Sequence, residues 1–245
     1  NIASRLDAQG RPIPLIAETG GMNAMIVDSS ALTEQVVVDV LASAFDSAGQ
    51  RCSALRVLCL QDEIADHTLK MLRGAMAECR MGNPGRLTTD IGPVIDSEAK
   101  ANIERHIQTM RSKGRPVFQA VRENSEDARE WQSGTFVAPT LIELDDFAEL
   151  QKEVFGPVLH VVRYNRNQLP ELIEQINASG YGLTLGVHTR IDETIAQVTG
   201  SAHVGNLYVN RNMVGAVVGV QPFGGEGLSG TGPKAGGPLY LYRLL

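Results

Sequence analysis

The sequence lacks the cysteine content of a disulfide-stabilised protein. It has only three cysteines in 245 residues, Cys52, Cys59 and Cys79, and a chain of this length can bury a sizeable core without covalent cross-links. The odd number and the low density exclude a disulfide framework and favour a reducing compartment. We therefore expect a cytoplasmic protein.

Basic stripes and long apolar runs are missing too. The 22 lysines and arginines are interspersed with 28 acidic residues, and the net charge is −6, whereas a nucleic-acid surface needs clustered basic residues. No apolar run approaches the roughly 20 residues of a membrane-spanning helix. We expect neither nucleic acid nor a membrane as a partner of this segment.

A start signal is also missing. The chain begins without an initiator methionine and without the basic-then-apolar layout of a signal peptide. Residues 2–10 have the pattern of the last turns of a helix that ends at Gly10, with no cap before it. We therefore expect that the chain begins inside a domain and that a preceding part of the protein is missing.

Metal-ligand spacing is absent as well. The five histidines are scattered and do not cluster with cysteines, so we expect no metal site. A Gly-x-Gly-x-x-Gly string at residues 225–230 matches a dinucleotide-binding fingerprint, but Pro233 breaks any helix after it, and the chain ends before the position of the acidic residue that the fingerprint needs about 20 residues on. We interpret this string as a loop.

What the chain does have is an alternation of strand-length apolar runs and helical periodicity along its whole length. This alternation predicts an α/β fold with a mostly parallel sheet flanked by helices. The expected strands are 12–17, 24–27, 55–60, 116–121, 136–144, 159–164, 184–189 and 205–210. The expected helices are 32–45, 62–79, 97–112, 170–179 and 192–199, with a charged loop at 122–132.

Cys52 follows one of these helices and a turn at Gly49. Glycine permits a backbone bend that a side chain would resist, so the thiol can lie at the mouth of a cleft, where a nucleophile is useful. The alternative for any cysteine is a buried thiol packed as a hydrophobic residue. We apply that interpretation to Cys59 and Cys79, which lie in apolar patterns.

Glu18 follows the strand expected at 12–17 and precedes two glycines, and the ends of strands are where α/β folds build sites. A thiol and a carboxylate together suit chemistry in which a thiolate attacks a carbonyl and a base activates the water that hydrolyses the covalent intermediate. A salt-bridged carboxylate is the alternative interpretation of Glu18.

Both residues lie in motifs that resemble a known family. Residues 17–21, Ala-Glu-Thr-Gly-Gly, and 45–52, Phe-x-x-x-Gly-Gln-x-Cys, resemble the two active-site signatures of the aldehyde dehydrogenase superfamily at that family's usual separation. Further matching motifs extend the resemblance over essentially the whole chain: 82–84, 92–95, 153–158 and 222–225.

The resemblance implies that Cys52 forms a thiohemiacetal, that a hydride passes to NAD, and that Glu18 deprotonates the water that releases the acid. Glu153 and Phe155 match the positions beside the nicotinamide ribose and ring, and the backbone at Thr19 and Gly20 would approach the nicotinamide.

The resemblance also implies an oxyanion hole made by the backbone amide of Cys52 and an asparagine side chain upstream of Glu18. No residue here matches that asparagine, because Asn23 lies after the glutamate motif. We expect it before Asn1.

The substrate is suggested by two further places. The Ser53 hydroxyl and the bare amides of a Gly215–Ala216 turn, with Phe223 nearby, could bind a carboxylate without a cationic side chain, which favours an acidic aldehyde. The combination resembles the L-glutamate γ-semialdehyde (Δ1-pyrroline-5-carboxylate) dehydrogenases, in particular the C-terminal module of bifunctional proline utilization A proteins. Monofunctional members tend to have Gly-Ser in this loop, so one hydroxyl contact is lost.

The expected organisation is a remnant of the dinucleotide-binding domain with the general-base strand (1–27), a catalytic domain (28–230), and a segment leading to an oligomerisation region (231–245). We expect an incomplete NAD site, no activity of the chain alone, a homo-oligomeric parent, and FAD only in an upstream module, if at all. The alternatives are a dehydrogenase of another acidic semialdehyde, a nicotinamide-independent cysteine acyl hydrolase or transferase, and a purely structural module.

Overall fold

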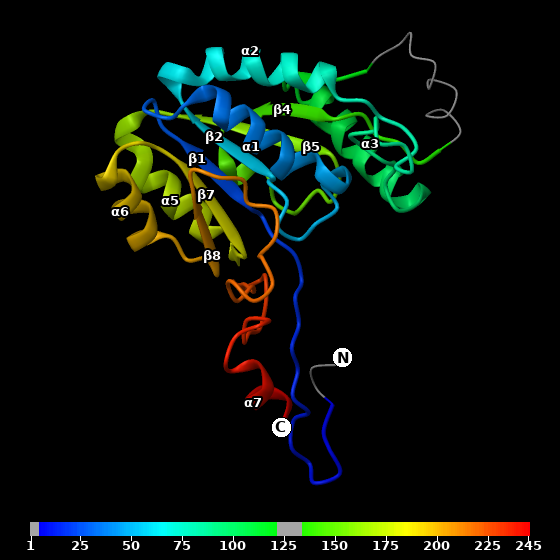
Figure 1. The fold of residues 1–245 in the computed structure, drawn as a ribbon, viewed down its shortest axis with the longest axis vertical. Coiled ribbons are helices and arrows are strands. Elements are labelled where there is room, and N and C mark those ends of the chain that lie inside the picture. Colours follow the sequence, from blue (N-terminus) through cyan, green and yellow to red (C-terminus); the bar gives the residue numbers. More distant parts are fainter. Residues whose placement is uncertain (1–4, 122–133) are drawn as a thin grey trace.

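A computed structural model describes residues 5–121 and 134–245. Its centre is a seven-stranded sheet in the order β3-β4-β5-β2-β1-β7-β8 (Figure 1). Every neighbouring pair is parallel except β3 and β4. The strands are β1 (Ala24–Val27), β2 (Val57–Gln61), β3 (Val117–Gln119), β4 (Thr140–Leu144), β5 (Val158–Tyr164), β7 (Thr184–His188) and β8 (Asn206–Val209).

The middle of the sheet is fully buried because its strands are apolar on both faces. All residues of β1, β2 and β7 are buried, as expected for parallel strands that are covered on two sides. In β1, Ala24 pairs with Val57 of β2 and with Leu185 of β7. β1 therefore lies at the centre of the core, and the segment just before it enters the sheet at its middle.

Helices cover both faces of the sheet. Right-handed crossovers place helices on opposite faces when the strand order reverses direction, and Figure 1 shows α1 and α2 on one side and α5 and α6 on the side of β7 and β8. The helices are α1 (Thr33–Phe45), α2 (Asp62–Glu78), α3 (Ser97–Ser112), α5 (Leu169–Ala178), α6 (Asp192–Ser201) and α7 (Tyr240–Leu244). None of the described helices is both long enough and apolar enough to cross a bilayer.

The predicted α/β fold is confirmed, and most expected elements differ from the observed ones only at their ends. The interpretation of 225–230 as a loop is also confirmed, because its only regular part is the short strand β9 (Glu226–Gly227), paired with β6 (Tyr181–Gly182), and no helix follows it. The charged loop expected at 122–132 lies outside the described residues.

Two expectations for the N-terminal segment are wrong. Where it is described, the helix expected at 2–10 is a turn in which Leu6 pairs with Pro12 across an isolated bridge. The strand expected at 12–17 is an extended arm, since no described strand lies beside it to complete a ladder. Figure 1 shows this arm leaving the body of the molecule next to the C-terminal segment.

Candidate active site

A strained turn joins α1 to Cys52. The short 3-10 helix η2 (Asp46–Gly49) contains three consecutive residues in the left-handed region, Ser47 (φ 56°), Ala48 (φ 54°) and Gly49 (φ 64°). A Cβ on Gly49 would lie 2.2 Å from the Gly156 carbonyl oxygen, so only glycine fits. The predicted role of Gly49 in bending the chain before the thiol is confirmed. Strain of this kind persists where surrounding contacts enforce it.

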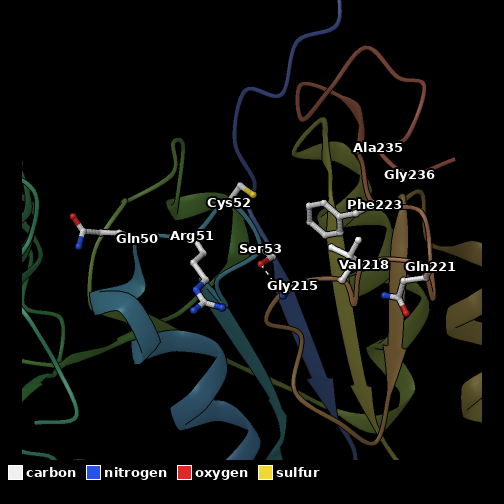
Figure 2. Close-up of a pocket in the computed structure, with 12 residues that line it drawn as sticks. Gln50, Arg51, Cys52, Ser53, Gly215, Val218, Gln221, Phe223, Ala235 and Gly236 are labelled. Atoms are coloured by element: carbon white, nitrogen blue, oxygen red, sulfur yellow. Dashed lines mark hydrogen bonds between the residues drawn. The ribbon is translucent and has the colours of Figure 1, made fainter. Parts of the chain in front are cut away.

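Cys52 lies exposed at the edge of a cavity of about 590 Å³ (Figure 2). Partial burial raises the pKa of its thiol, and the nearby carboxylates of Glu153 and Glu18 raise it further, while the backbone N–H groups of Ser53 and Cys52 lower it. These two amides are positioned to stabilise negative charge at the sulfur. The other two cysteines are different: Cys59 is fully buried in the core, and Cys79 is half-buried against it.

We expect alkylating reagents to label Cys52 much faster than Cys59 or Cys79. Cys59 has no solvent access and burial raises its pKa to about 12, while the half-buried Cys79 thiol donates to the Ala75 carbonyl oxygen at 3.6 Å. Because the thiolate is the reactive form, the Cys52 rate should still be rising above the ordinary thiol pKa. Peptide mapping after limited alkylation of the folded chain measures this order, and equal labelling of all three would contradict it.

Glu18 lies on the extended arm instead of at the end of a strand. Its backbone forms an isolated antiparallel bridge with Gly230, flanked by Thr19 N–H donating to Ser229 O at 3.1 Å and Thr231 N–H donating to Ala17 O at 3.0 Å. Desolvation raises the pKa of the Glu18 carboxyl, partly offset by a hydrogen bond from the Gly225 amide. The charge of Glu18 raises the pKa of the Cys52 thiol, as the smallest of the contributions to that pKa.

Glu153 connects the glutamate motif to the region of Cys52. Its Oε2 accepts a hydrogen bond from the Gly21 amide at 3.2 Å, and its Oε1 accepts two from Arg56 at 2.9 and 3.1 Å. Gly20 (φ 130°) lies so close that a Cβ there would be 2.5 Å from Oε2. The structure thus brings Glu153 and the Gly20–Gly21 backbone together.

Phe155 projects from the same loop with 44% of its surface exposed. It lines a second cleft of about 600 Å³, which it shares with Glu153 and with Gln50 of the cysteine turn. An aromatic ring that is exposed in a cleft is available to pack against a ligand.

Ser53 and Gly215 meet on the other side of Cys52. Ser53 is buried, and its Oγ accepts a hydrogen bond from the Gly215 amide at 3.1 Å, which Figure 2 shows as a dashed line. This contact occupies the Gly215 amide that was expected to face a ligand, but it leaves the Ser53 O–H as a donor. Ala216 and Phe223 line the same cavity, and antiparallel hydrogen bonds to Ala235 hold the Phe223 backbone.

Sequence reasoning missed two polar residues that organise this site. Asn23 is buried, and its Nδ2 donates to the carbonyl oxygens of Cys52 (2.7 Å) and Ala54 (2.8 Å) while its Oδ1 accepts from the Thr184 amide. These bonds occupy the side chain, which agrees with not assigning it to an oxyanion hole. The second is Arg56, a fully buried cation. Asn23 and Arg56 each stand directly before an apolar strand in the sequence. A polar residue in such a position needs buried partners, and this pattern could have drawn attention to both.

The charged and thiol groups around Cys52 do not form a metal site. Among residues 5–121 and 134–245, no group of three or more His, Cys, Asp or Glu side chains could hold a metal ion. The arrangement instead offers an exposed thiol, a carboxylate with a raised pKa, and two clefts that meet at Gln50. This combination can attack a carbonyl and activate a water.

Comparisons with known proteins agree with this chemistry. Residues 1–244 match the model of the "Aldehyde dehydrogenase family". The chain is 95% identical over its full length to the bifunctional protein PutA of Salmonella typhimurium, and it covers 19% of that protein. It is 36% identical over 93% of its length to the 1-pyrroline-5-carboxylate dehydrogenase of Geobacillus kaustophilus, of which it covers 43%.

A solved structure of 1-pyrroline-5-carboxylate dehydrogenase from Thermus with bound NAD has the same fold, with a TM-score of 0.83 and 36% identity over 94% of the chain. The match covers 43% of that protein, so the chain spans less than half the length of each of these relatives. A family model that matches almost every residue, on a fold and site of the same kind, settles the family. The chain belongs to the aldehyde dehydrogenase family.

Proposed function

We propose that this chain carries the nucleophile and the general base of an enzyme that oxidises L-glutamate γ-semialdehyde to L-glutamate with NAD, the second step of proline degradation. The observation that carries the proposal is the exposed Cys52 thiol, which lines the first cleft with Ser53, while the second cleft, lined by Glu153, adjoins it at Gln50. The names of the relatives, PutA and 1-pyrroline-5-carboxylate dehydrogenase, support this substrate.

In the proposed reaction the Cys52 sulfur adds to the aldehyde carbon, and the developing oxyanion accepts a hydrogen bond from the Cys52 amide. NAD, when bound, supplies the hydride acceptor. Glu18 then takes a proton from a water molecule, whose oxygen attacks the acyl carbon, and the bond to sulfur breaks to release the acid and the thiolate. The raised Glu18 pKa suits a base, because it strengthens the affinity of the carboxylate for the proton of the attacking water.

The second cleft fits a nicotinamide nucleotide. Glu153 places a carboxylate at its wall whose Oε2 accepts one backbone hydrogen bond, Phe155 has an exposed ring, and the Gly20 backbone lies next to Glu153. We propose that these residues hold the ribose and the nicotinamide, and the Thermus relative was solved with NAD.

The substrate carboxylate is proposed to bind at Ser53, the Gly215–Ala216 turn and Phe223. We expect Ser53→Ala to raise KM for glutamate semialdehyde about 10- to 100-fold in a full-length enzyme that contains this chain, since a hydrogen bond to a charged group contributes about 1.5–3 kcal/mol. KM for propanal, which has no carboxylate, should change little. NADH absorbance measures both, and parallel losses would contradict the carboxylate site. Gly215→Ala provides a second probe, because φ 69° strains any side chain there although the space is open.

We further propose that the 245-residue chain is inactive on its own, because the relatives use more than twice its length and the described residues supply only part of an oxyanion hole. Losing one oxyanion donor typically lowers kcat about 10²–10³-fold. We expect calorimetric titration to show weak or no NAD binding. Micromolar binding, or turnover of glutamate semialdehyde, would show that these residues suffice.

The remaining assignments stay predictions: a cytoplasmic homo-oligomer that binds no nucleic acid through this segment, with FAD only in another module. For the domains, we propose a boundary before Ala24 instead of after residue 27, because β1 is a central strand of the sheet.

A further inference from the structure

Arg56 contacts both the turn before Cys52 and the loop that carries Glu153 and Phe155. It is fully buried immediately before β2, four positions after Cys52. Its Nη1 donates to the Gly49 carbonyl at 2.7 Å and its Nη2 to the Arg51 carbonyl at 3.0 Å, so two of its nitrogens hold the turn that leads to Cys52. The same turn contains the strained residues Ser47 and Ala48.

The other contacts of Arg56 reach the loop that contains Glu153, Phe155 and Gly156, which lines the second cleft. Nε and Nη2 bind Glu153 Oε1, the guanidinium carbon lies 5.0 Å from the centre of the Phe155 ring, and Nη1 is 3.4 Å from the Gly156 carbonyl oxygen. A planar guanidinium can make these divergent contacts at once, whereas a lysine ammonium can make only some of them.

A buried cation has to be explained by its partners, because desolvation is costly without them. Burial lowers the pKa of Arg56, and the Glu153 carboxylate acts in the opposite direction. The charge partner of Arg56 is therefore the same carboxylate that receives the Gly21 amide. One ion pair joins three chain segments that are far apart in sequence.

We propose that Arg56 is a positioning residue that locks the Cys52 turn to the Glu153–Phe155 loop, so that the nucleophile and the cofactor-facing side chains form one rigid unit. The inference rests on the proposed function only in naming Cys52 the nucleophile. The electrostatics link the same groups: Cys52 raises the pKa of Arg56, and the Glu153 carboxylate that Arg56 binds raises the pKa of the Cys52 thiol, as does Glu18, while the amides of residues 52 and 53 lower it.

The test uses the 245-residue chain without aldehyde or NAD. The alkylation rate of Cys52 by iodoacetamide is measured against pH, with peptide mapping, and amide hydrogen exchange is followed at residues 49–53. In Arg56→Met we expect the apparent thiol pKa to rise, with at least a threefold slower reaction at neutral pH, and exchange in the turn at least tenfold faster. Arg56→Lys keeps the positive charge but not the planar guanidinium that makes several hydrogen bonds. In this variant we expect a smaller change of the Cys52 pKa than in Arg56→Met, but similarly fast hydrogen exchange in the turn.

Arg115→Met is the matched control, since Arg115 also pairs with Asp145 and Glu149 but lies outside both clefts; it should leave Cys52 unchanged. The proposal would be overturned if folded Arg56→Met kept the parental alkylation profile of Cys52 and the parental hydrogen exchange at residues 49–53. If that variant does not fold, parental exchange in Arg56→Lys would overturn it. The proposed function is tested independently: it would be wrong if a full-length enzyme with a normally reactive Cys52 formed no NADH from glutamate semialdehyde and NAD.

Discussion

Cys52→Ala is expected to abolish NADH formation from glutamate semialdehyde in a full-length enzyme that contains this chain, with a loss of about 10⁴-fold or more. Removing a nucleophile removes the covalent route entirely, and only binding and oxyanion contacts remain. Cys52 is exposed and does not belong to the buried core, so the fold and the temperature of thermal unfolding should be unchanged.

Cys79→Ala is the matched control for this experiment. It changes another thiol, one that lies at the end of α2 and lines neither cleft, and it should retain parental activity. Substantial turnover by Cys52→Ala would mean that another group attacks the aldehyde. Loss of activity in both variants would point to a general effect of cysteine removal.

Glu18→Gln is expected to slow the steady state about 10²–10⁴-fold, the usual contribution of a general base, while leaving the first turnover nearly intact. Glutamine cannot accept the proton of the attacking water, but it does not prevent the thiol from adding to the aldehyde. A stopped-flow trace should show a burst of NADH followed by a slow phase. If burst and steady state fall together, Glu18 acts before hydrolysis.

The pH profile gives a second signature of Glu18. Desolvation raises its pKa above the ordinary glutamate value, and the base works only when ionised, so the steady-state rate should fall as the pH drops through that raised pKa. This acidic limb should disappear in Glu18→Gln. Glu34→Gln, an exposed change on α1, should keep it.

Most of the sheet and its helices could be predicted from the sequence because their apolar periodicity is strong and their ends carry turn residues. The extended conformation of the N-terminal arm could not be predicted in this way. The apolar residues from Pro12 to Ala17 indicate burial, but a strand also needs a neighbour, and local sequence says nothing about whether one is present. Glu18 was consequently placed at the end of a strand that does not form.

The reactive residues of the site could be predicted from the sequence, but the buried side chains that hold them in place could not. Cys52, Glu18 and Ser53 belong to recognisable motifs; the structure places Cys52 and Ser53 in one cleft, and Glu18 on the arm that pairs with Gly230. Asn23 binds the Ala54 carbonyl and the Thr184 amide, and Arg56 binds the Glu153 carboxylate; these partners are distant in sequence, so the contacts depend on tertiary structure. The hydrogen bond from the Gly215 amide to Ser53 could likewise not be predicted from the sequence.

The central claim is that Cys52 carries the substrate covalently and that Glu18 releases it, and mass spectrometry of a trapped intermediate tests this most directly. Full-length Glu18→Gln enzyme is mixed with glutamate semialdehyde and NAD, quenched in acid during the burst, and digested. We expect an acyl group on the peptide that contains Cys52, in amounts that match the NADH burst, and little of it in the parent enzyme. NADH formation without an adduct on Cys52, or an adduct on a different residue, would contradict it.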